Sequence, residues 1–291
     1  SIPGSHESCA RHGTGSVCQA LSITQQLNSG IRFLDIRCKY VSDDDASIFF
    51  PIHHYNFYQD ITFAQVQQEC VDFLSVHNQE VILMNVQQEE HLKGVDAHYS
   101  VPGLQFEEKF IDLFASDYWQ TPEDIPTLDQ VRGKIVLIRT LHTTGANTFK
   151  GWPGGELKSK SGGGGLMWSG FDISGESTNS CFKTQNGWDA WNGSDKGDKV
   201  EEYLRLAAAG ADSPDDIYLN FLSHTQGDIA TSASQMNNRI STYLTTTLTD
   251  HSQRLGVLPM DFVENTGGGA GCLPDLIIQH NPFKPDFAYS Y

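Results

Sequence analysis

Short apolar runs alternate with amphipathic segments along most of the chain, and this alternation restricts the possible folds more than any other feature. The runs are rich in Ile, Val, Leu or Phe, whereas the segments between them repeat apolar residues at helical spacing. Strands that alternate with helices indicate parallel β/α units. The strand-like runs lie at residues 31–37, 47–53, 81–86, 134–139, 217–222 and 255–260.

This pattern predicts an α/β fold, a single (β/α)8 TIM-like barrel with distortions. The first residues of the chain provide the expected first strand, and one more strand is expected inside the Gly-rich segment 149–192. The number of strands then approaches eight, and the 291 residues are close to the usual size of such a barrel. No internal repeat is visible, so we expect one domain over residues 1–291.

Three segments carry the helical pattern. Thr62 with Gln65 forms an expected capping box at the start of residues 62–76. Segments 199–209 and 230–248 are expected to be helices as well. The apolar residues that repeat at helical spacing in the first segment are Phe63, Val66, Cys70, Phe73 and Leu74.

Segment 149–192 differs in composition from the rest of the chain. It contains four of the five tryptophans and four consecutive glycines at 162–165. Linkers seldom carry so many aromatic residues, and long loops at the carboxyl-terminal rim of a barrel often carry function. We therefore expect rim loops here, with residues 162–168 and Trp152 with Pro153 as candidates for membrane contact. Packing of these aromatic residues on the barrel is the alternative.

The charge of the chain excludes one class of partner. The chain has 36 acidic and 19 basic side chains, which gives a net charge of −17 with neutral histidine. Binding to nucleic acid depends largely on Lys and Arg side chains that neutralise phosphates, so we expect no nucleic-acid partner. No apolar run reaches the roughly 18 residues that a membrane-spanning helix needs.

The six cysteines favour a secreted protein with disulfides. Their number is even and none lies in a C-x-x-C pair, so we expect three disulfides of undetermined pairing and no zinc site. Six buried thiols in a cytosolic protein are the alternative. Asn192 begins a glycosylation sequon, which also fits an extracellular protein. The six are Cys9, Cys18, Cys38, Cys70, Cys181 and Cys272.

Reactive side chains gather at the expected carboxyl ends of the strands, where parallel barrels carry their active sites. Asp35 and Arg37 share one face of their strand, because strand side chains alternate with period two. Histidines can move protons, carboxylates fix their tautomer, and an arginine can bind phosphate oxygens in a bidentate manner. This set suits the cleavage of a phosphodiester. Its members are His6, Glu7, Asp35, Arg37, His53, His54 and Asp261.

Several motifs resemble the X-domain of phosphatidylinositol-specific phospholipases C, most closely the small bacterial enzymes. They are I-P-G-S-H-E-S at 2–8, G-I-R-F-L-D-I-R at 30–37, the pair His53–His54, and V-I-L-M-N at 81–85. The resemblance continues at 134–138, 217–221 and 255–261 and so covers nearly the whole chain. It implies a distorted (β/α)8 barrel that cleaves phosphatidylinositol to diacylglycerol and inositol 1,2-cyclic phosphate.

The resemblance also implies roles for individual residues. His6 would be the general base acting on the inositol 2-hydroxyl, held by Asp261. His54 would be the general acid for the diacylglycerol oxygen, paired with Asp35, and His53 would be structural. Arg37 would bind the phosphate, oriented by Glu7, which stands where the family has Asp.

The head-group pocket departs further from the family pattern. Gln87 stands where the bacterial enzymes have a lysine, so a charged contact to the inositol ring is lost. Asn186 and Trp188 align with an inositol-contacting Asp and Tyr, and Trp188 can still stack on the sugar face. Arg139 lies near the position of a ring-binding arginine. The reaction type is therefore better defined than the substrate, which could be the free lipid or a glycosyl-anchored protein.

Two other functions stay open. One is a metal-dependent phosphodiesterase of the glycerophosphodiesterase or sphingomyelinase D type, which would need several oxygen ligands for its cation. Arg37 disfavours it by placing a positive charge where a further carboxylate would stand. The other is a catalytically silent barrel that binds inositol lipids. We expect a monomer that acts at a membrane interface without a metal or other cofactor.

Overall fold

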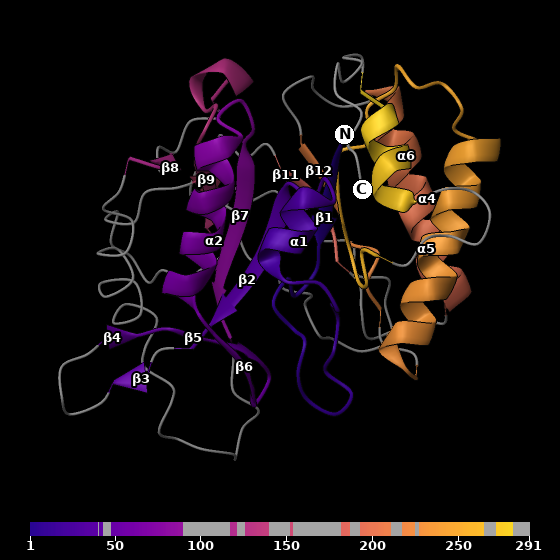
Figure 1. Ribbon diagram of the computed structural model, residues 1–291. Helices are drawn as coiled ribbons and strands as arrows, with labels where there is room; N and C mark the ends of the chain where they lie inside the picture. Colours follow the sequence, from indigo (N-terminus) through magenta and orange to yellow (C-terminus); the bar gives the residue numbers. More distant parts are fainter. Residues whose placement is uncertain are drawn as a thin grey trace. The chain divides into compact units, whose positions relative to one another are not determined.

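The computed structural model describes most of the chain, and its packing divides the chain into two compact units (Figure 1). The first unit consists of Ser1–His6, Gln25–Phe33 and Leu157–Tyr291, and the second of Glu7–Thr24 and Leu34–Glu156. The described residues are 1–39, 41–42, 48–89, 117–120, 126–139, 152–153, 182–186, 193–210, 217–224, 227–264 and 272–281.

The first unit is built on parallel strands. Its sheet has the order β1–β13–β12–β11, and each of these strands is parallel to its neighbour. Helix α5 packs against both α4 and α6, and α6 contacts β1. The elements are β1 (Ile2–Ser5), β11 (Phe182–Gln185), α4 (Gly193–Ala209), β12 (Ile217–Asn220), α5 (Ile229–Thr246), β13 (Val257–Met260) and α6 (Leu273–Gln279).

The second unit combines parallel strands with an antiparallel hairpin. Its sheet has the order β10–β9–β7–β2, in which β9 is parallel to β7, β8 and β10. A hairpin of β5 and β6 joins the sheet through β2, and β3 pairs only with β4. The elements are β2 (Phe33–Cys38), β3 (Val41–Ser42), β4 (Ile48–Phe49), β5 (Pro51–His54), β6 (Phe57–Thr62), α2 (Phe63–Val76), β7 (Ile82–Gln88), β8 (Trp119–Gln120), the 3-10 turn η2 (Leu128–Gln130), β9 (Ile135–Arg139) and β10 (Trp152–Pro153). Helix α1 (Ile23–Asn28) lies between β1 and β2 in the chain.

Helix α2 forms as its sequence predicts. Thr62 is the N-cap, its side chain accepts from the Gln65 N–H, and the Gln65 side chain accepts from the Thr62 N–H. This capping box satisfies two N–H groups that the first helical turn leaves without partners. The five apolar residues expected on one face are the five buried ones. Local sequence therefore determines this helix.

A glycine in β1 lets an aromatic ring pack directly on the strand. A Cβ at Gly4 would lie 2.9 Å from the ring of Phe33, closer than side-chain atoms approach each other. Phe33 in turn meets Phe221 edge to face, with ring centroids 6.4 Å apart. Gly in a strand commonly marks such a close approach. Phe33 thus connects β1 with Phe221, which follows β12.

Most expected elements are present, but the third strand differs from the prediction. Run 47–53 was expected to be a parallel barrel strand, whereas β5 runs antiparallel to β2, with Cys38 opposite Ile52. A parallel return needs a crossover of a dozen or more residues, usually helical. The connection here instead contains the β3–β4 ladder. Segment 149–192 contains both β10 and β11, where the sequence predicts one strand. The sequence also does not predict β3, β6, β8, α1 and α6.

Two further sequence expectations concern membranes and thiols. Among the described residues, no helix is both long and apolar enough to cross a membrane. None of the five described cysteines takes part in a disulfide, so the expectation of three disulfides is wrong. Burial raises the pKa values of Cys9, Cys38 and Cys70 above the usual thiol range. Cys181, Asn192 and segment 162–168 lie outside the described residues.

Candidate active site

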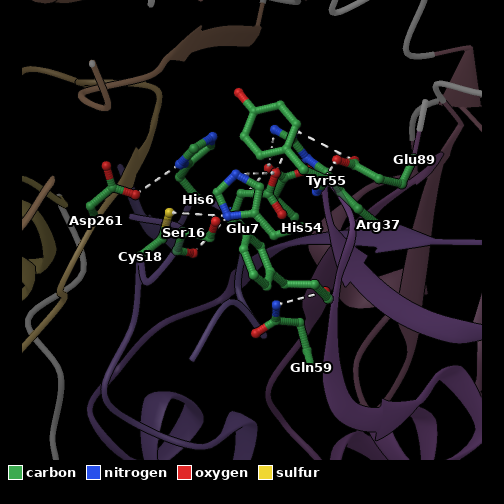
Figure 2. Close-up of polar contacts among 12 residues, drawn as sticks. His6, Glu7, Ser16, Cys18, Arg37, His54, Tyr55, Gln59, Glu89 and Asp261 are labelled. Carbon is green, nitrogen blue, oxygen red and sulfur yellow. Dashed lines mark hydrogen bonds and ion pairs between the residues drawn. The ribbon is translucent and has the colours of Figure 1, made fainter. Parts of the chain in front are cut away.

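His6 and Asp261 leave the sheet of the first unit side by side. β1 and β13 are parallel, and their last residues, Ser5 and Met260, are register partners. The N–H of His6 donates to the carbonyl of Met260 over 3.0 Å. The His6 side chain meets the next residue of the other strand, with Nδ1 2.8 Å from Asp261 Oδ1 (Figure 2).

This contact determines which nitrogen of His6 can act as a base. A carboxylate only accepts hydrogen bonds, so Nδ1 carries the proton and Nε2 of neutral His6 is the basic nitrogen. Asp261 is buried, and its carbonyl accepts from Nδ2 of Asn237 on α5. The ring of Phe221 meets the His6 imidazole edge to face at 5.9 Å. Backbone, carboxylate and aromatic packing therefore fix the orientation of His6.

A buried lysine lies in the same unit. Lys196 on α4 is fully buried, and its Nζ donates to Oε1 of Gln185 at the end of β11 over 2.7 Å. Burial lowers the pKa of Lys196 to about 7, although the negative charge of Asp261 opposes this shift. Burial, followed by the charge of Lys196, lowers the pKa of His224. Lys196 can thus change its charge near neutral pH.

Arg37 is the centre of the second unit's polar cluster. Its Nη1 lies 2.5 Å from Oε1 of Glu7 and 3.9 Å from Oε2 of Glu89, and its Nη2 lies 3.2 Å from Oδ2 of Asp35. Burial would lower the pKa of Arg37, but the three carboxylate charges outweigh it and raise the pKa. The guanidinium therefore stays positive at every working pH. Its planar donors can hold phosphate oxygens as well as carboxylates.

Asp35 ties three segments of the second unit together. One oxygen accepts from Nδ2 of Asn85 on β7 over 2.8 Å, and the other accepts from the N–H of Glu7 over 3.1 Å and from Arg37. The backbone N–H of Asp35 also donates to Oγ of Ser8. Through these contacts Asp35 orients Arg37 and the segment that follows β1. The pairing of Asp35 with His54 stays a prediction.

His54 is held mainly through Nδ1, which faces a backbone carbonyl. Its Nδ1 donates to the carbonyl of Ser16 over 2.7 Å, and Sγ of Cys18 lies 3.9 Å from the same nitrogen (Figure 2). Its Nε2 lies 3.7 Å from Oε1 of Glu7. The ring of Tyr55 stacks on the imidazole with centroids 4.7 Å apart. A carbonyl only accepts, so Nδ1 is protonated and Nε2 is the nitrogen that can exchange a proton.

Left-handed backbone follows each of three candidate residues. Glu7, Tyr55 and Phe262 have φ values of 43°, 52° and 47°, and they come directly after His6, His54 and Asp261. Residues other than glycine adopt this region rarely and at a cost of about 1–3 kcal/mol. Three of the four described non-glycine residues with positive φ thus directly follow candidate side chains, and the fourth is Asp60 on β6.

The residues expected around the head group are only partly described. Gln87 is half-buried on β7, and Asn186 is half-buried directly after β11. Arg139 ends β9, and Trp188 lies outside the described residues. His53 contacts the ring of Tyr58 at 5.7 Å, in keeping with a structural role.

Sequence reasoning missed two charged residues of these clusters. Glu89 directly follows β7 and could have been found by applying the strand-end argument to every strand. Lys196 lies on a helix, and no local signal distinguishes it from a surface lysine. Glu89 belongs to the second unit and Lys196 to the first.

Comparison with known proteins shows which family the chain resembles. Residues 2–140 match the family model described as phosphatidylinositol-specific phospholipase C, X domain. Over these residues the chain is similar to that family. It is 25% identical to the 1-phosphatidylinositol phosphodiesterase of Listeria monocytogenes over 91% of this chain and 76% of that protein. It is 27% identical to the protein of the same name from Staphylococcus aureus, over 96% of this chain and 88% of that protein.

Solved structures of the family confirm the fold. A Staphylococcus aureus phosphatidylinositol-specific phospholipase C has a TM-score of 0.76 at 23% identity, over 97% of this chain and 92% of that one. The Listeria monocytogenes enzyme has a TM-score of 0.69 at 22% identity, over 97% and 93%. The predicted α/β class with a TIM-like barrel is therefore correct. The expectation of a single domain stays a prediction.

Proposed function

We propose that this protein cleaves phosphatidylinositol, or a glycosylphosphatidylinositol, to diacylglycerol and inositol 1,2-cyclic phosphate. The observation that carries this proposal is the hydrogen bond of His6 to Asp261, which makes Nε2 of His6 a base, in a chain similar to the phosphatidylinositol-specific phospholipase C family. The similarity to two bacterial 1-phosphatidylinositol phosphodiesterases supports the same substrate class.

The reaction uses the two histidines in opposite directions. His6 takes the proton of the inositol 2-hydroxyl while its oxygen forms a bond to phosphorus. His54 gives a proton to the diacylglycerol oxygen while the bond from phosphorus to that oxygen breaks. Asp261 stabilises the imidazolium that forms at His6. Because the attacking hydroxyl is a neighbour of the phosphate on the same ring, no bimolecular attack by water is needed.

Arg37 is the proposed phosphate clamp. Charge accumulates on the non-bridging oxygens as the attacking oxygen bonds to phosphorus, and the half-buried guanidinium of Arg37 can stabilise it. Glu7 and Asp35 hold Arg37 in place, and we further propose that Asp35 supports His54. Both carboxylates already contact a guanidinium, which disfavours the metal-dependent alternative, because such a site needs several oxygen ligands for its cation. We propose no cofactor.

The head-group contacts and the cellular setting are also proposals. Gln87, Arg139, Asn186 and Trp188 are the proposed contacts to the inositol ring. The proposed substrate is a lipid, so the protein works at a membrane interface. A similar phosphatidylinositol-specific phospholipase C from Staphylococcus aureus binds membranes, and this supports the proposal. We propose a secreted monomer with no nucleic-acid partner, in which segment 162–168 and Trp152 contact the membrane.

One experiment tests this proposal against its alternatives. Phosphatidylinositol is incubated with the protein in excess EDTA and followed by ³¹P NMR, and a cyclic phosphate is the expected first soluble product. A substrate analogue without the 2-hydroxyl should be inert. Activity that needs added Ca²⁺ or Mg²⁺ would support the metal-dependent phosphodiesterase, and lipid binding without turnover would support the silent barrel. Cleavage of the 2-deoxy analogue at a comparable rate would contradict the intramolecular attack.

A further inference from the structure

The turn directly after His54 is held by a buried carboxylate that the proposed reaction does not use. Glu89 follows β7, is 7% exposed, and its Oε1 accepts from the backbone N–H of Tyr55 over 2.7 Å. Its own N–H donates to the carbonyl of Cys38 at the end of β2. Tyr55 has a φ of 52°, which a residue with a side chain adopts only when its surroundings enforce it. Glu89 provides part of that enforcement.

The turn places an aromatic ring on the proposed acid. The Tyr55 ring lies 4.7 Å from the His54 imidazole at an interplanar angle of 21°. Tyr55 is 37% exposed, so its ring is not buried in a core. An aromatic face attracts a cation and is more favourable for an imidazolium than for a neutral imidazole. The stack therefore favours the protonated form, which a general acid needs before it reacts.

The second oxygen of Glu89 faces the phosphate clamp. Oε2 lies 3.9 Å from Nη1 of Arg37. Burial raises the pKa of Glu89, while the charge of Arg37, the hydrogen bond from Tyr55 and the charge of Lys39 oppose this shift. One buried side chain thus connects the guanidinium with the strained turn after His54.

We propose that Glu89 and Tyr55 are positioning residues that orient His54, so that its proton is delivered to the leaving alcohol. Glu89 holds the left-handed turn, the turn holds the Tyr55 ring on His54, and the ring keeps the imidazolium in place. In this step Nε2 of His54 loses its proton to the diacylglycerol oxygen, the bond from phosphorus to that oxygen breaks, and neutral imidazole remains. The inference rests on the proposed function.

Comparing kcat on two substrates with different leaving groups distinguishes a role in proton delivery from a merely structural role. A diacylglycerol alkoxide is strongly basic and needs a proton as it leaves, whereas a nitrophenolate is stable without one. The two substrates are a short-chain phosphatidylinositol and a nitrophenyl ester of inositol phosphate. Glu89→Ala and Tyr55→Leu should lower kcat on the lipid on the order of 10²-fold, the size of one general acid. On the nitrophenyl ester the loss should stay within about threefold, since proton delivery contributes little there.

Matched variants distinguish the effect of the turn at Tyr55 from that of the phosphate clamp Arg37. They also distinguish the effect of the Tyr55 ring from that of its hydroxyl. Arg37→Lys removes bidentate phosphate binding and should lower turnover of both esters alike. Tyr55→Phe keeps the ring and should retain most of the lipid turnover that Tyr55→Leu loses. Glu89→Gln keeps an oxygen that can accept the Tyr55 N–H, so it should recover most of the lipid turnover that Glu89→Ala loses. If Glu89→Ala does not fold, as judged by circular dichroism, Glu89→Gln and Tyr55→Leu carry the test.

An NMR signal reports the same geometry without turnover. The stacked Tyr55 ring should shift the Cε1–H proton of His54 upfield, and Glu89→Ala should move it back toward its position in Tyr55→Leu. Equal losses of kcat on both esters, or an unchanged His54 signal in Glu89→Ala, would overturn the inference while leaving the proposed function intact. Failure of the wild-type protein to cleave either ester would overturn the proposed function and the inference with it.

Discussion

The two histidine clusters differ in the partner that holds each imidazole. In the first unit, Nδ1 of His6 meets the carboxylate of Asp261 directly at 2.8 Å. In the second unit, Nδ1 of His54 meets the neutral carbonyl of Ser16, and Glu7 lies 3.7 Å from its other nitrogen. A carboxylate at Nδ1 stabilises the cation that forms when Nε2 accepts a proton, and a carbonyl does so less. The asymmetry favours His6 as the base and His54 as the acid.

Removal of either histidine should have the largest effect. His6→Ala and His54→Ala should each lower lipid turnover by about 10²–10⁴-fold, which is typical of one general acid or base. The double variant should be little worse than either single one, because groups that act as a unit are not additive. Turnover of short-chain phosphatidylinositol, measured by ³¹P NMR, reports the loss. His53→Ala is the matched control, and a loss as severe as that of His54→Ala would reverse the assignment within the pair.

Arg37→Lys should have the next largest effect, on the order of 10-fold to 100-fold. A lysine keeps the positive charge but cannot form two parallel hydrogen bonds to phosphate oxygens. Steady-state turnover with and without EDTA measures it, and the chelator should change neither the wild type nor the variant. A wild-type protein that loses its activity in EDTA and regains it with Ca²⁺ would contradict the guanidinium clamp.

Lys196 should make the stability of the first unit depend on pH. Its pKa is about 7 in the folded protein against 10.5 ordinarily, so the unfolded chain binds more protons between these values. Folding stability from this group therefore rises with pH across that window, by at most about 1.4 kcal/mol per pH unit. Lys196→Met should flatten this rise in urea unfolding at pH 7.5, 8.5 and 9.5. Lys199→Met on the same helix is the control, and an equal change in both variants would contradict the burial of Lys196.

The thiols should give the smallest effect. The described cysteines are not in disulfides, so at least five thiols should titrate with a chromogenic disulfide reagent in denaturant without reductant. In the folded protein, Cys9, Cys38 and Cys70 should react slowly, because their burial raises the pKa values and few thiolates form. Reductant should leave the melting temperature unchanged. A clear fall in melting temperature on reduction would restore the disulfide prediction.

The sequence alone determined the features that depend on neighbouring residues. The capping box of Thr62 and Gln65, the buried face of α2 and most strand positions follow from local periodicity and hydrogen bonding. Period two also placed Asp35 and Arg37 on one face of β2, where they form an ion pair. The candidate histidines could be named from sequence as well, since they lie at the ends of expected strands.

Only the tertiary structure decided which partner each side chain meets. The antiparallel direction of β5, the hydrogen bond of Asn85 to Asp35, and the hold of Glu89 on the turn at Tyr55 all join different segments of the chain. The burial of Lys196 depends in the same way on the packing of α4 against the sheet. Local sequence sets φ, ψ and side-chain alternation, whereas hydrogen-bond partners depend on distances that exist only after distant segments have packed.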